Sequence, residues 1–226
     1  MTLDSLNYTV ALPEIFLLAM TCVVLVIDVF LPQSKRHFTY VLTQLTVIVT
    51  FALLVSNQTD SRLLAFNDLF VQDSMADILK MFVLIIGFGV FVYSREYLIA
   101  RNNFKGEFYV LGLFSLLGMM LMISANHLLM LYLGLELLSL CLYALVAFNR
   151  DNGDASEAAM KYFVLGAMAS GMLLYGISMV YGATGHLVLS DVATVIAAGD
   201  ADQTVLVFGL VFIVIGVAFK FGAVPF

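Results

Sequence analysis

Long apolar runs, separated by short polar connections, cover almost the whole chain. A helix that crosses the hydrocarbon core of a bilayer needs about 20 predominantly apolar residues. The runs are continuous, whereas a strand of a membrane barrel alternates in polarity over about 10 residues. We therefore predict seven membrane-spanning helices, at residues 13–31, 38–56, 76–97, 108–125, 128–148, 157–181 and 204–226.

The predicted fold class is all-α, a polytopic transmembrane helix bundle. No connection is long enough to form a soluble domain, so residues 1–226 are predicted to be a single transmembrane domain. The stretch 183–203 mixes apolar residues with Asp and is expected to lie along the outer surface. Pro225 lacks a backbone donor and disfavours helix at the residue before it, so a break is expected just after Lys220 and the seventh helix is expected to be discontinuous.

Basic residues are distributed unevenly among the connections. If the seven spans alternate in direction, the connections on one side of the membrane carry a single basic residue, Arg62. By the positive-inside rule, connections 32–37, 98–107 and 149–156 face the cytoplasm and the N-terminus lies outside. The other side carries six basic residues: Lys35, Arg36, Arg95, Arg101, Lys105 and Arg150.

Composition supports a membrane protein and excludes several classes of function. Charged residues make up 12% of the chain and hydrophobic residues 62%, whereas soluble proteins contain about 25% charged residues. A net charge of −6 argues against nucleic acid as a partner. Cys22 and Cys141 lie inside apolar runs and are expected to be small core residues. No motif for a nucleotide, zinc or an iron–sulfur cluster is present in the sequence, so we expect no cofactor or metal site in this chain.

Three charged residues lie in or at the edge of apolar runs: Glu136, Lys161 and Lys220. A charge at the centre of a bilayer costs at least about 2.5–3.5 kcal/mol on insertion scales. Ionisable residues retained in such positions most often mark a route for protons or cations. We therefore take these three as candidates for proton translocation.

Glu136 and Lys220 are predicted to interact. Glu136 lies about eight residues into its span, roughly 12 Å deep at 1.5 Å per residue. Lys220 shares a helical face with Gly209 and Gly216, which would let a neighbouring helix approach. Burial favours the neutral amine and a nearby carboxylate favours the charged one, so movement of the carboxylate would switch the proton. The alternative is a purely structural ion pair.

Lys161 lies about one turn from the cytoplasmic end of its span, where a lysine can extend its amine to the interface. Two pairs of small residues follow it, Gly166 with Ser170 and Ala167 with Gly171. Such spacing lets helices pack closely, and we expect Lys161 to face the bundle.

Other polar residues near the span ends receive simpler interpretations. Lys80 is expected to extend to the outer interface. Glu14 and Asp28 flank the first span and are expected to be interfacial. His127 is expected to open a helix, with a role as a proton exit as the alternative, and His186 is expected to lie in a connection.

The sequence resembles a known family. The motifs LGLELLSL and FKFGAVPF are typical of antiporter-like membrane subunits, a group that includes sodium/proton antiporter subunits. Within that group, the segments EFY, SANHL and EAAMKYF favour subunit N of bacterial proton-translocating NADH:quinone oxidoreductase, respiratory complex I. The resemblance covers most of residues 8–226 and is strongest over 104–226.

The resemblance implies the N-terminal half of a fourteen-helix subunit with two inverted five-helix repeats, the first beginning near residue 108 and incomplete in this chain. It implies that Glu136 pairs with Lys220, and that Lys161 also takes part in proton transfer. NADH, FMN, iron–sulfur clusters and quinone are implied in partner subunits. The implied partners are other membrane subunits and lipid, in the bacterial inner membrane with a periplasmic N-terminus.

Two alternatives to a proton-translocating subunit of the quinone reductase remain at this stage. One is a subunit of a standalone cation/proton antiporter, without a redox partner. The other is a membrane scaffold that transports nothing, in which the buried charges form structural pairs.

Overall fold

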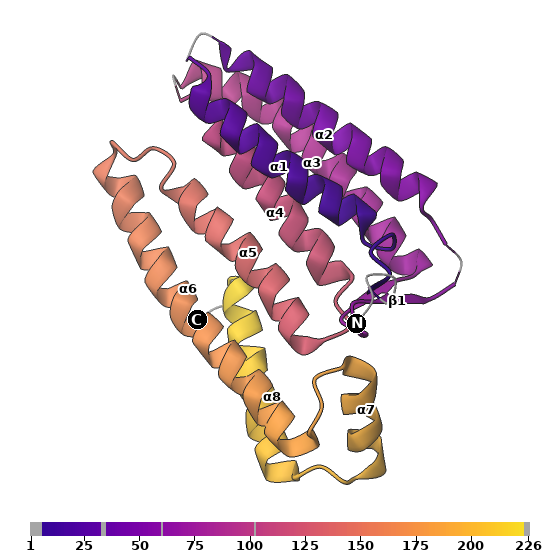
Figure 1. Ribbon diagram of the computed structural model, residues 1–226. Helices are drawn as coiled ribbons and strands as arrows, with labels where there is room; N and C mark the ends of the chain where they lie inside the picture. The colour runs from indigo at the N-terminus through magenta and orange to yellow at the C-terminus, as the bar shows by residue number, and fades with distance from the viewer. Residues whose placement is uncertain (1–5, 33–34, 60, 102, 224–226) are drawn as a thin grey trace.

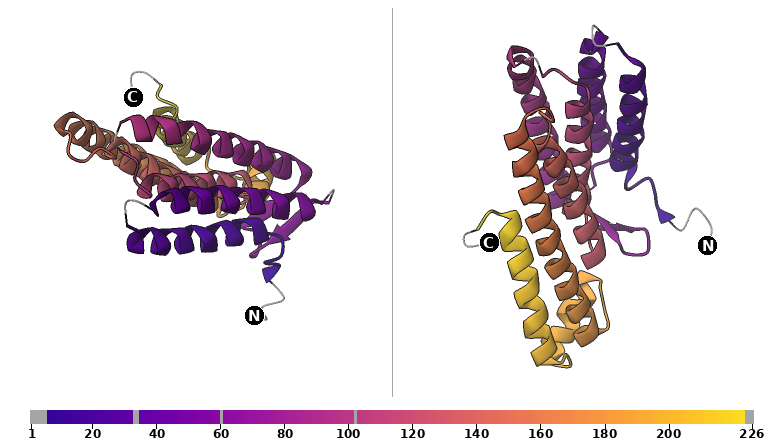
Figure 2. Two further views of the ribbon diagram at one scale, coloured as in Figure 1. Left: turned by 90° about the horizontal axis from the view of Figure 1, so that it is seen from above. Right: turned by 90° about the vertical axis from the view of Figure 1, so that its left-hand side faces the viewer.

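In the described part of the chain, eight helices and one short hairpin form an elongated bundle (Figure 1). The computed structural model describes residues 6–32, 35–59, 61–101 and 103–223. Helices α1 to α4 lie together, and α5 connects them to α6 and α8, as the views in Figure 2 also show. The helices are α1 (Leu12–Phe30), α2 (His37–Ser56), α3 (Ser74–Ala100), α4 (Glu107–Ile123), α5 (Leu128–Val146), α6 (Gly153–Thr184), α7 (Leu189–Ala198) and α8 (Gln203–Lys220).

Each of the seven predicted spans coincides with one helix to within a few residues, which confirms the all-α membrane bundle. In the described part of the chain, six helices are long and apolar enough to cross a membrane, namely α1, α2, α3, α5, α6 and α8. Helix α4 is apolar but has 17 residues. Helix α8 ends at Lys220, as predicted, and Gly222 follows with a φ of 68°. Pro225, on which that prediction rested, lies outside the described residues.

A small hairpin between α2 and α3 was not predicted. Strands β1 (Leu63–Ala65) and β2 (Phe70–Gln72) pair antiparallel, and three residues each are too few for a periodic pattern. The hairpin is attached to the turn between α4 and α5, because Val71 N donates to Ser124 O at 2.9 Å and Asn126 N donates to Leu69 O at 3.0 Å.

Polar caps and glycines set several helix ends. The side chains of Asp73, Asn152 and Asp202 accept hydrogen bonds from the first turns of α3, α6 and α8. These bonds satisfy backbone donors that have no partner within the helix. Helices α6 and α7 end at Gly185 and Gly199, whose φ angles of 74° and 78° suit glycine.

Helix α4 is central to the first half of the bundle, since it packs against α1, α2, α3 and α5. Tyr109, Leu113 and Met120 of α4 are completely buried. They belong to a core with Leu17 of α1 and Leu84 of α3. The shortest predicted span is therefore the most enclosed by other helices.

Glycines allow two pairs of helices to touch through their backbones. A Cβ on Gly118 of α4 would lie 2.8 Å from Gly134 O of α5. A Cβ on Gly176 of α6 would lie 2.6 Å from Gly209 O of α8. One on Gly216 of α8 would lie 2.7 Å from a side-chain carbon of α6. The pairs α4–α5 and α6–α8 are thus joined at distances that larger residues would prevent.

The connections meet in two groups, one at each end of the bundle. At one end, Glu107 lies 3.2 Å from Arg36 and 3.6 Å from Arg150, which brings three basic connections together. At the other end, His127 forms a β-bridge with Val188. Seven spans that alternate in direction would place the odd-numbered connections at one end of the bundle and the even-numbered ones at the other, as these contacts do.

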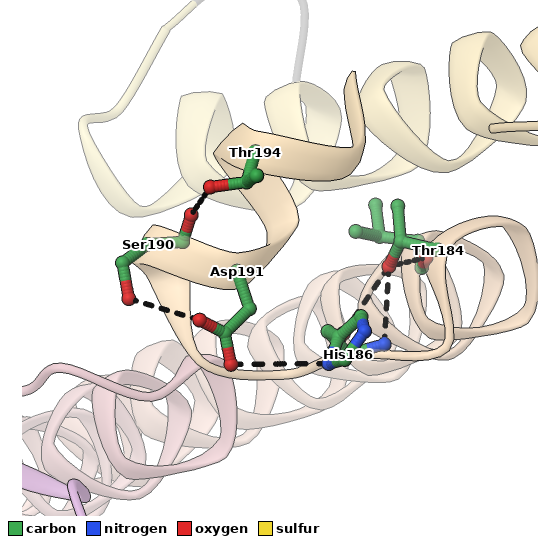
Figure 3. A network of polar contacts seen from close by, with 6 residues as sticks. Thr184, His186, Ser190, Asp191 and Thr194 are labelled. Atoms are coloured by element: carbon green, nitrogen blue, oxygen red, sulfur yellow. Dashed lines mark hydrogen bonds and ion pairs between the residues drawn. The ribbon is translucent and has the colours of Figure 1, made fainter. Parts of the chain in front are cut away.

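Polar contacts fold the connection after α6 onto α7 (Figure 3). Thr184 Oγ1 donates to His186 O and accepts from His186 N, both at 3.3 Å. His186 Nδ1 lies 3.8 Å from Asp191 Oδ2, and Thr194 Oγ1 donates to Ser190 O at 2.9 Å. His186 lies in a connection, as predicted, and the segment after α6 holds a short helix at the end of the bundle.

Candidate functional site

Glu136 of α5 and Lys220 of α8 come together in the interior of the second half of the bundle. Lys220 Nζ lies 3.5 Å from Glu136 Oε1, and the two residues are 84 positions apart in the chain. The Lys220 side chain is 10% exposed and the Glu136 side chain is 21% exposed. The glycine face of α8 packs on α6, as its spacing predicted, and this packing places the lysine at α5.

Lys220 also donates to two hydroxyls of α5. Its Nζ lies 2.8 Å from Ser139 Oγ and 3.1 Å from Tyr143 Oη. Glu136, Ser139 and Tyr143 follow one another at spacings of three and four, so they share one face of the helix. An ammonium has three donors, and all three have an acceptor on this face.

Helix α6 supplies a partner for the carboxylate. Ser170 Oγ donates a short hydrogen bond to Glu136 Oε1. One turn earlier, Gly166 leaves room for the Tyr143 hydroxyl, since a Cβ there would lie 2.0 Å from Tyr143 Oη. Of the small pairs predicted to face a neighbouring helix, Gly166 and Ser170 are buried, whereas Ala167 and Gly171 are exposed.

Aromatic rings lie beside the amine. Lys220 Nζ lies 5.6 Å from the centre of the Tyr143 ring, on the side of the ring that carries the hydroxyl. Tyr162 meets Tyr143 edge-on at 4.6 Å and stacks on Phe219 at 6.5 Å. Lys220 is also in the last turn of α8, where the negative end of the helix dipole favours a cation. These surroundings therefore suit a charged amine, and its carboxylate partner lies farther away, at 3.5 Å, than either of its hydroxyl partners.

Lys161 does not join this site. Its Nζ lies 2.5 Å from Glu157 Oε1, one turn earlier in α6, and its side chain is 70% exposed. The expectation that Lys161 faces the bundle is therefore not met among the described residues. The small residues that suggested it do point inward at Gly166 and Ser170, but Lys161 lies on another face of the helix.

The interpretation of Lys80 and Glu14 as interfacial is wrong. Lys80 is 1% exposed and Glu14 is 3% exposed, and Lys80 Nζ lies 2.6 Å from Glu14 Oε1. Asp28 is also buried, and Thr39 Oγ1 donates to it at 2.6 Å. Position along a span gives depth but not the direction of a side chain, and tertiary packing turned all three residues inward.

His127 begins α5, as predicted. Its Nδ1 accepts a hydrogen bond from Leu129 N at 3.2 Å. Burial lowers the pKa of His127 below its ordinary value. Both observations favour the neutral imidazole, because a protonated Nδ1 cannot accept.

Sequence reasoning missed three members of the site: Ser139, Tyr143 and Ser170. The first two had a signal, since both lie on the Glu136 face of an otherwise apolar helix. Ser170 was noted only as a small residue.

The site brings together groups that can donate or accept a proton. It combines one carboxylate, one amine and three hydroxyls. No group of three or more His, Cys, Asp or Glu that could hold a metal occurs among residues 6–32, 35–59, 61–101 and 103–223. The arrangement holds the carboxylate and the amine in contact with each other, with one hydroxyl group beside the carboxylate and two beside the amine.

Comparisons with known proteins find relatives of the chain. Residues 125–226 match the family model "NADH:quinone oxidoreductase/Mrp antiporter, TM". The chain is 53% identical to NADH-quinone oxidoreductase subunit N of Thioalkalivibrio sulfidiphilus, over 100% of this chain and 47% of that protein. It is 54% identical to subunit N of Thiobacillus denitrificans, with the same coverage. The chain thus spans about half the length of these relatives.

Solved structures agree with the sequence relatives. A chain of respiratory complex I from Thermus thermophilus matches with a TM-score of 0.76 and 29% identity, over 95% of this chain and 45% of that one. A chain of a membrane-bound sulfane sulfur reductase, an archaeal respiratory membrane complex, matches with a TM-score of 0.73 and 26% identity, over 94% and 44%. By sequence and by fold, the chain is similar to subunit N of NADH-quinone oxidoreductase, and its residues 125–226 match the NADH:quinone oxidoreductase/Mrp antiporter family.

Proposed function

We propose that this chain forms part of a proton-translocating membrane subunit of NADH:quinone oxidoreductase. Electron transfer from NADH through FMN and iron–sulfur clusters to quinone takes place in other subunits, and this chain contributes to the coupled movement of protons. The other membrane subunits of the complex and membrane lipid are its partners. The observation that carries the proposal is the enclosed contact of Lys220 with Glu136, Ser139 and Tyr143.

In this proposal Lys220 is the proton carrier. Ser139 and Tyr143 accept from the ammonium and hold it in place. Ser170 holds Glu136 from the other side. When Glu136 approaches, the ammonium is stabilised and keeps its proton. When Glu136 withdraws, the enclosed charge loses its partner and the proton is released.

The test substitutes the pair in the assembled complex. Lys220→Ala removes the carrier, so quinone reductase activity and proton pumping should fall sharply. Lys220→Arg keeps the charge but cannot release a proton, because arginine stays protonated; it should assemble and still lose pumping. Glu136→Gln should reduce pumping by removing the charge partner.

Both activities are measured in membranes, with assembly checked separately by the amount of intact complex. A Lys220→Arg complex that pumps at the wild-type rate would make Lys220 a structural residue and refute the assignment. Full activity in the complete subunit without a redox partner would instead support the standalone antiporter.

Lys161 is proposed as a second proton-transfer residue outside the Lys220 contact. Its support is the family resemblance and its position on the same helix as Ser170. Because Lys161 is exposed and touches Glu157 in this chain, it would exchange protons with groups beyond these residues. Loss of pumping without loss of assembly in a Lys161→Gln complex would support this role.

The proposed location is the bacterial inner membrane, with the N-terminus on the periplasmic side. The support is the six-to-one distribution of basic residues, together with the meeting of Arg36, Glu107 and Arg150 at one end of the bundle. In a background without Cys22 and Cys141, a cysteine at Asn152 should resist an impermeant thiol reagent added to intact cells. A cysteine at Asp191 should react, and the reverse pattern would refute the orientation.

We also propose that residues 1–226 form a single transmembrane domain, in which a five-helix repeat begins at α4, near residue 108, and is incomplete. The support is the close packing of the helices from α4 onward, with backbone contacts between α4 and α5 and between α6 and α8.

A further inference from the structure

A second group of ionisable residues is buried in the first half of the bundle, remote from Lys220 in the chain and on other helices. Glu14 of α1 and Asp77 and Lys80 of α3 are 3%, 2% and 1% exposed. Lys80 Nζ lies 2.6 Å from Glu14 Oε1 and 4.8 Å from the centre of the Phe70 ring. The proposed mechanism uses none of these residues.

The three groups do not balance in charge. With all three ionised, these buried side chains carry two negative charges and one positive charge, which leaves one negative charge in excess. A net charge enclosed away from water is costly. One bound proton would neutralise the group.

The position of the extra proton follows from the partners of each carboxylate. Gln72 Nε2 lies 3.3 and 3.1 Å from the two oxygens of Asp77 and donates to them. Asp77 is also in the first turn of α3, where the positive end of the helix dipole favours an anion. The other nearby acid, Asp73, caps the same helix by accepting from Ala76 N. Asp77 and Asp73 are therefore stabilised as carboxylates.

Glu14 has no comparable partners. Its Oε2 is buried and accepts no hydrogen bond from any described residue. Glu14 also lines a cavity of about 340 Å³, and the other described residues that line it are apolar. They come from α1, the hairpin and the ends of α4 and α5: Ala11, Ile15, Leu18, Phe66, Leu69, Phe70, Leu117, Leu121 and Met130. Beside an apolar cavity, a carboxyl oxygen without a hydrogen-bond partner is more stable when protonated than when charged.

We propose that Glu14 is a second proton-binding residue: its Oε2 takes a proton from a water molecule or hydronium ion that enters the cavity and returns it to water there, while Oε1 stays beside Lys80. The site is separate from the pair of Glu136 and Lys220 and does not depend on the proposed mechanism there. Proton binding at Glu14 removes the excess charge of the buried group, and release restores it.

The test is chemical modification of the intact complex with a hydrophobic carbodiimide. A carbodiimide reacts with a protonated carboxyl: the acid proton moves to a carbodiimide nitrogen, and the carboxyl oxygen bonds to the central carbon. The resulting O-acylisourea rearranges to a stable N-acylurea, which is located by peptide mass spectrometry. The apolar cavity admits the reagent to Glu14.

Two other buried carboxylates serve as internal controls. Asp28 accepts from Thr39, Asp77 accepts from Gln72, and neither lines the cavity. We expect modification at Glu14 that decreases as the pH is raised, with little at Asp28 or Asp77. An unmodified Glu14, or equal modification of all three, would overturn the proposal.

A second measurement separates proton binding from a structural ion pair. Glu14→Gln keeps the shape and cannot take up a proton, so the complex should assemble with a reduced ratio of protons pumped to quinone reduced. The double variant Glu14→Gln with Lys80→Met removes both charges. If either variant assembles and pumps as many protons per quinone reduced as the wild type, Glu14 has only a structural role and the proposal is wrong. This conclusion holds whatever the variants of Lys220 show.

Discussion

Gly166→Ala should disturb the Lys220 site without changing any charged residue. A Cβ at position 166 would lie 2.0 Å from Tyr143 Oη, and ordinary contact begins at 3.4 Å. The hydroxyl must therefore move by about 1.4 Å. Its contact with Lys220 is already 3.1 Å long, so a displacement of this size away from the amine breaks it.

The size of the effect follows from the contact that is lost. A hydrogen bond to a charged group contributes about 1.5–3 kcal/mol. Lys220 keeps Ser139 and Glu136, so Gly166→Ala should lower proton pumping partly, to the level of Tyr143→Phe, and less than Lys220→Ala does.

The matched control is Gly171→Ala on the same helix, because a Cβ there meets nothing within 4 Å. Pumping and quinone reductase activity are measured in membranes at equal amounts of assembled complex. If Gly166→Ala pumps as well as Gly171→Ala while Tyr143→Phe is impaired, the argument from the position of the hydroxyl is wrong.

Three further outcomes are expected. Gly118→Ala should lower the melting temperature of the complex, with a penalty of about 1–3 kcal/mol from overpacking, because its Cβ would lie 2.8 Å from Gly134 O; an unchanged melting temperature would contradict this. Lys161→Gln should leave assembly unchanged, because an exposed ion pair contributes less than about 1 kcal/mol and Lys161 is 70% exposed; loss of assembly would contradict the placement. The hydrogen bond from Leu129 N to His127 should stabilise α5 fully at pH values above 6.5, the ordinary pKa of the side chain, and should be lost as the pH falls through the lowered pKa of the folded state. His127→Asn, which can cap the helix without titrating, should remove that part of the pH dependence of the melting temperature.

The sequence was sufficient to predict the spans, because length and hydropathy are properties of each segment alone. It also predicted the approach of Glu136 and Lys220, because the glycines of α8 mark the face that packs. The hairpin was missed because three-residue strands carry no period, and it is held by bonds to Ser124 and Asn126 far along the chain.

The burial of Glu14 and Lys80 was missed for a different reason. Each residue lies near a span end, where an interfacial position is an adequate explanation for one charge by itself. Only the folded structure, in which the side chains of Glu14 on α1 and Lys80 on α3 meet, reveals that the two charges share one enclosed space. Opposite charges at similar depth on different spans were the available signal.

The glycine contacts join four helices into two units, α4 with α5 and α6 with α8, with consequences for how a movement could pass between them. Gly118 and Gly134 fasten α4 to α5, while Gly176 and Gly209 fasten α6 to α8. The contact between Glu136 and Lys220 crosses the seam between these units. At 3.5 Å it is longer than the about 2.7–2.9 Å of a charge-assisted hydrogen bond. Sliding of one unit against the other by less than about 1 Å would close or open it, so a small displacement of these helices would suffice to make or break the contact between the carboxylate and the amine.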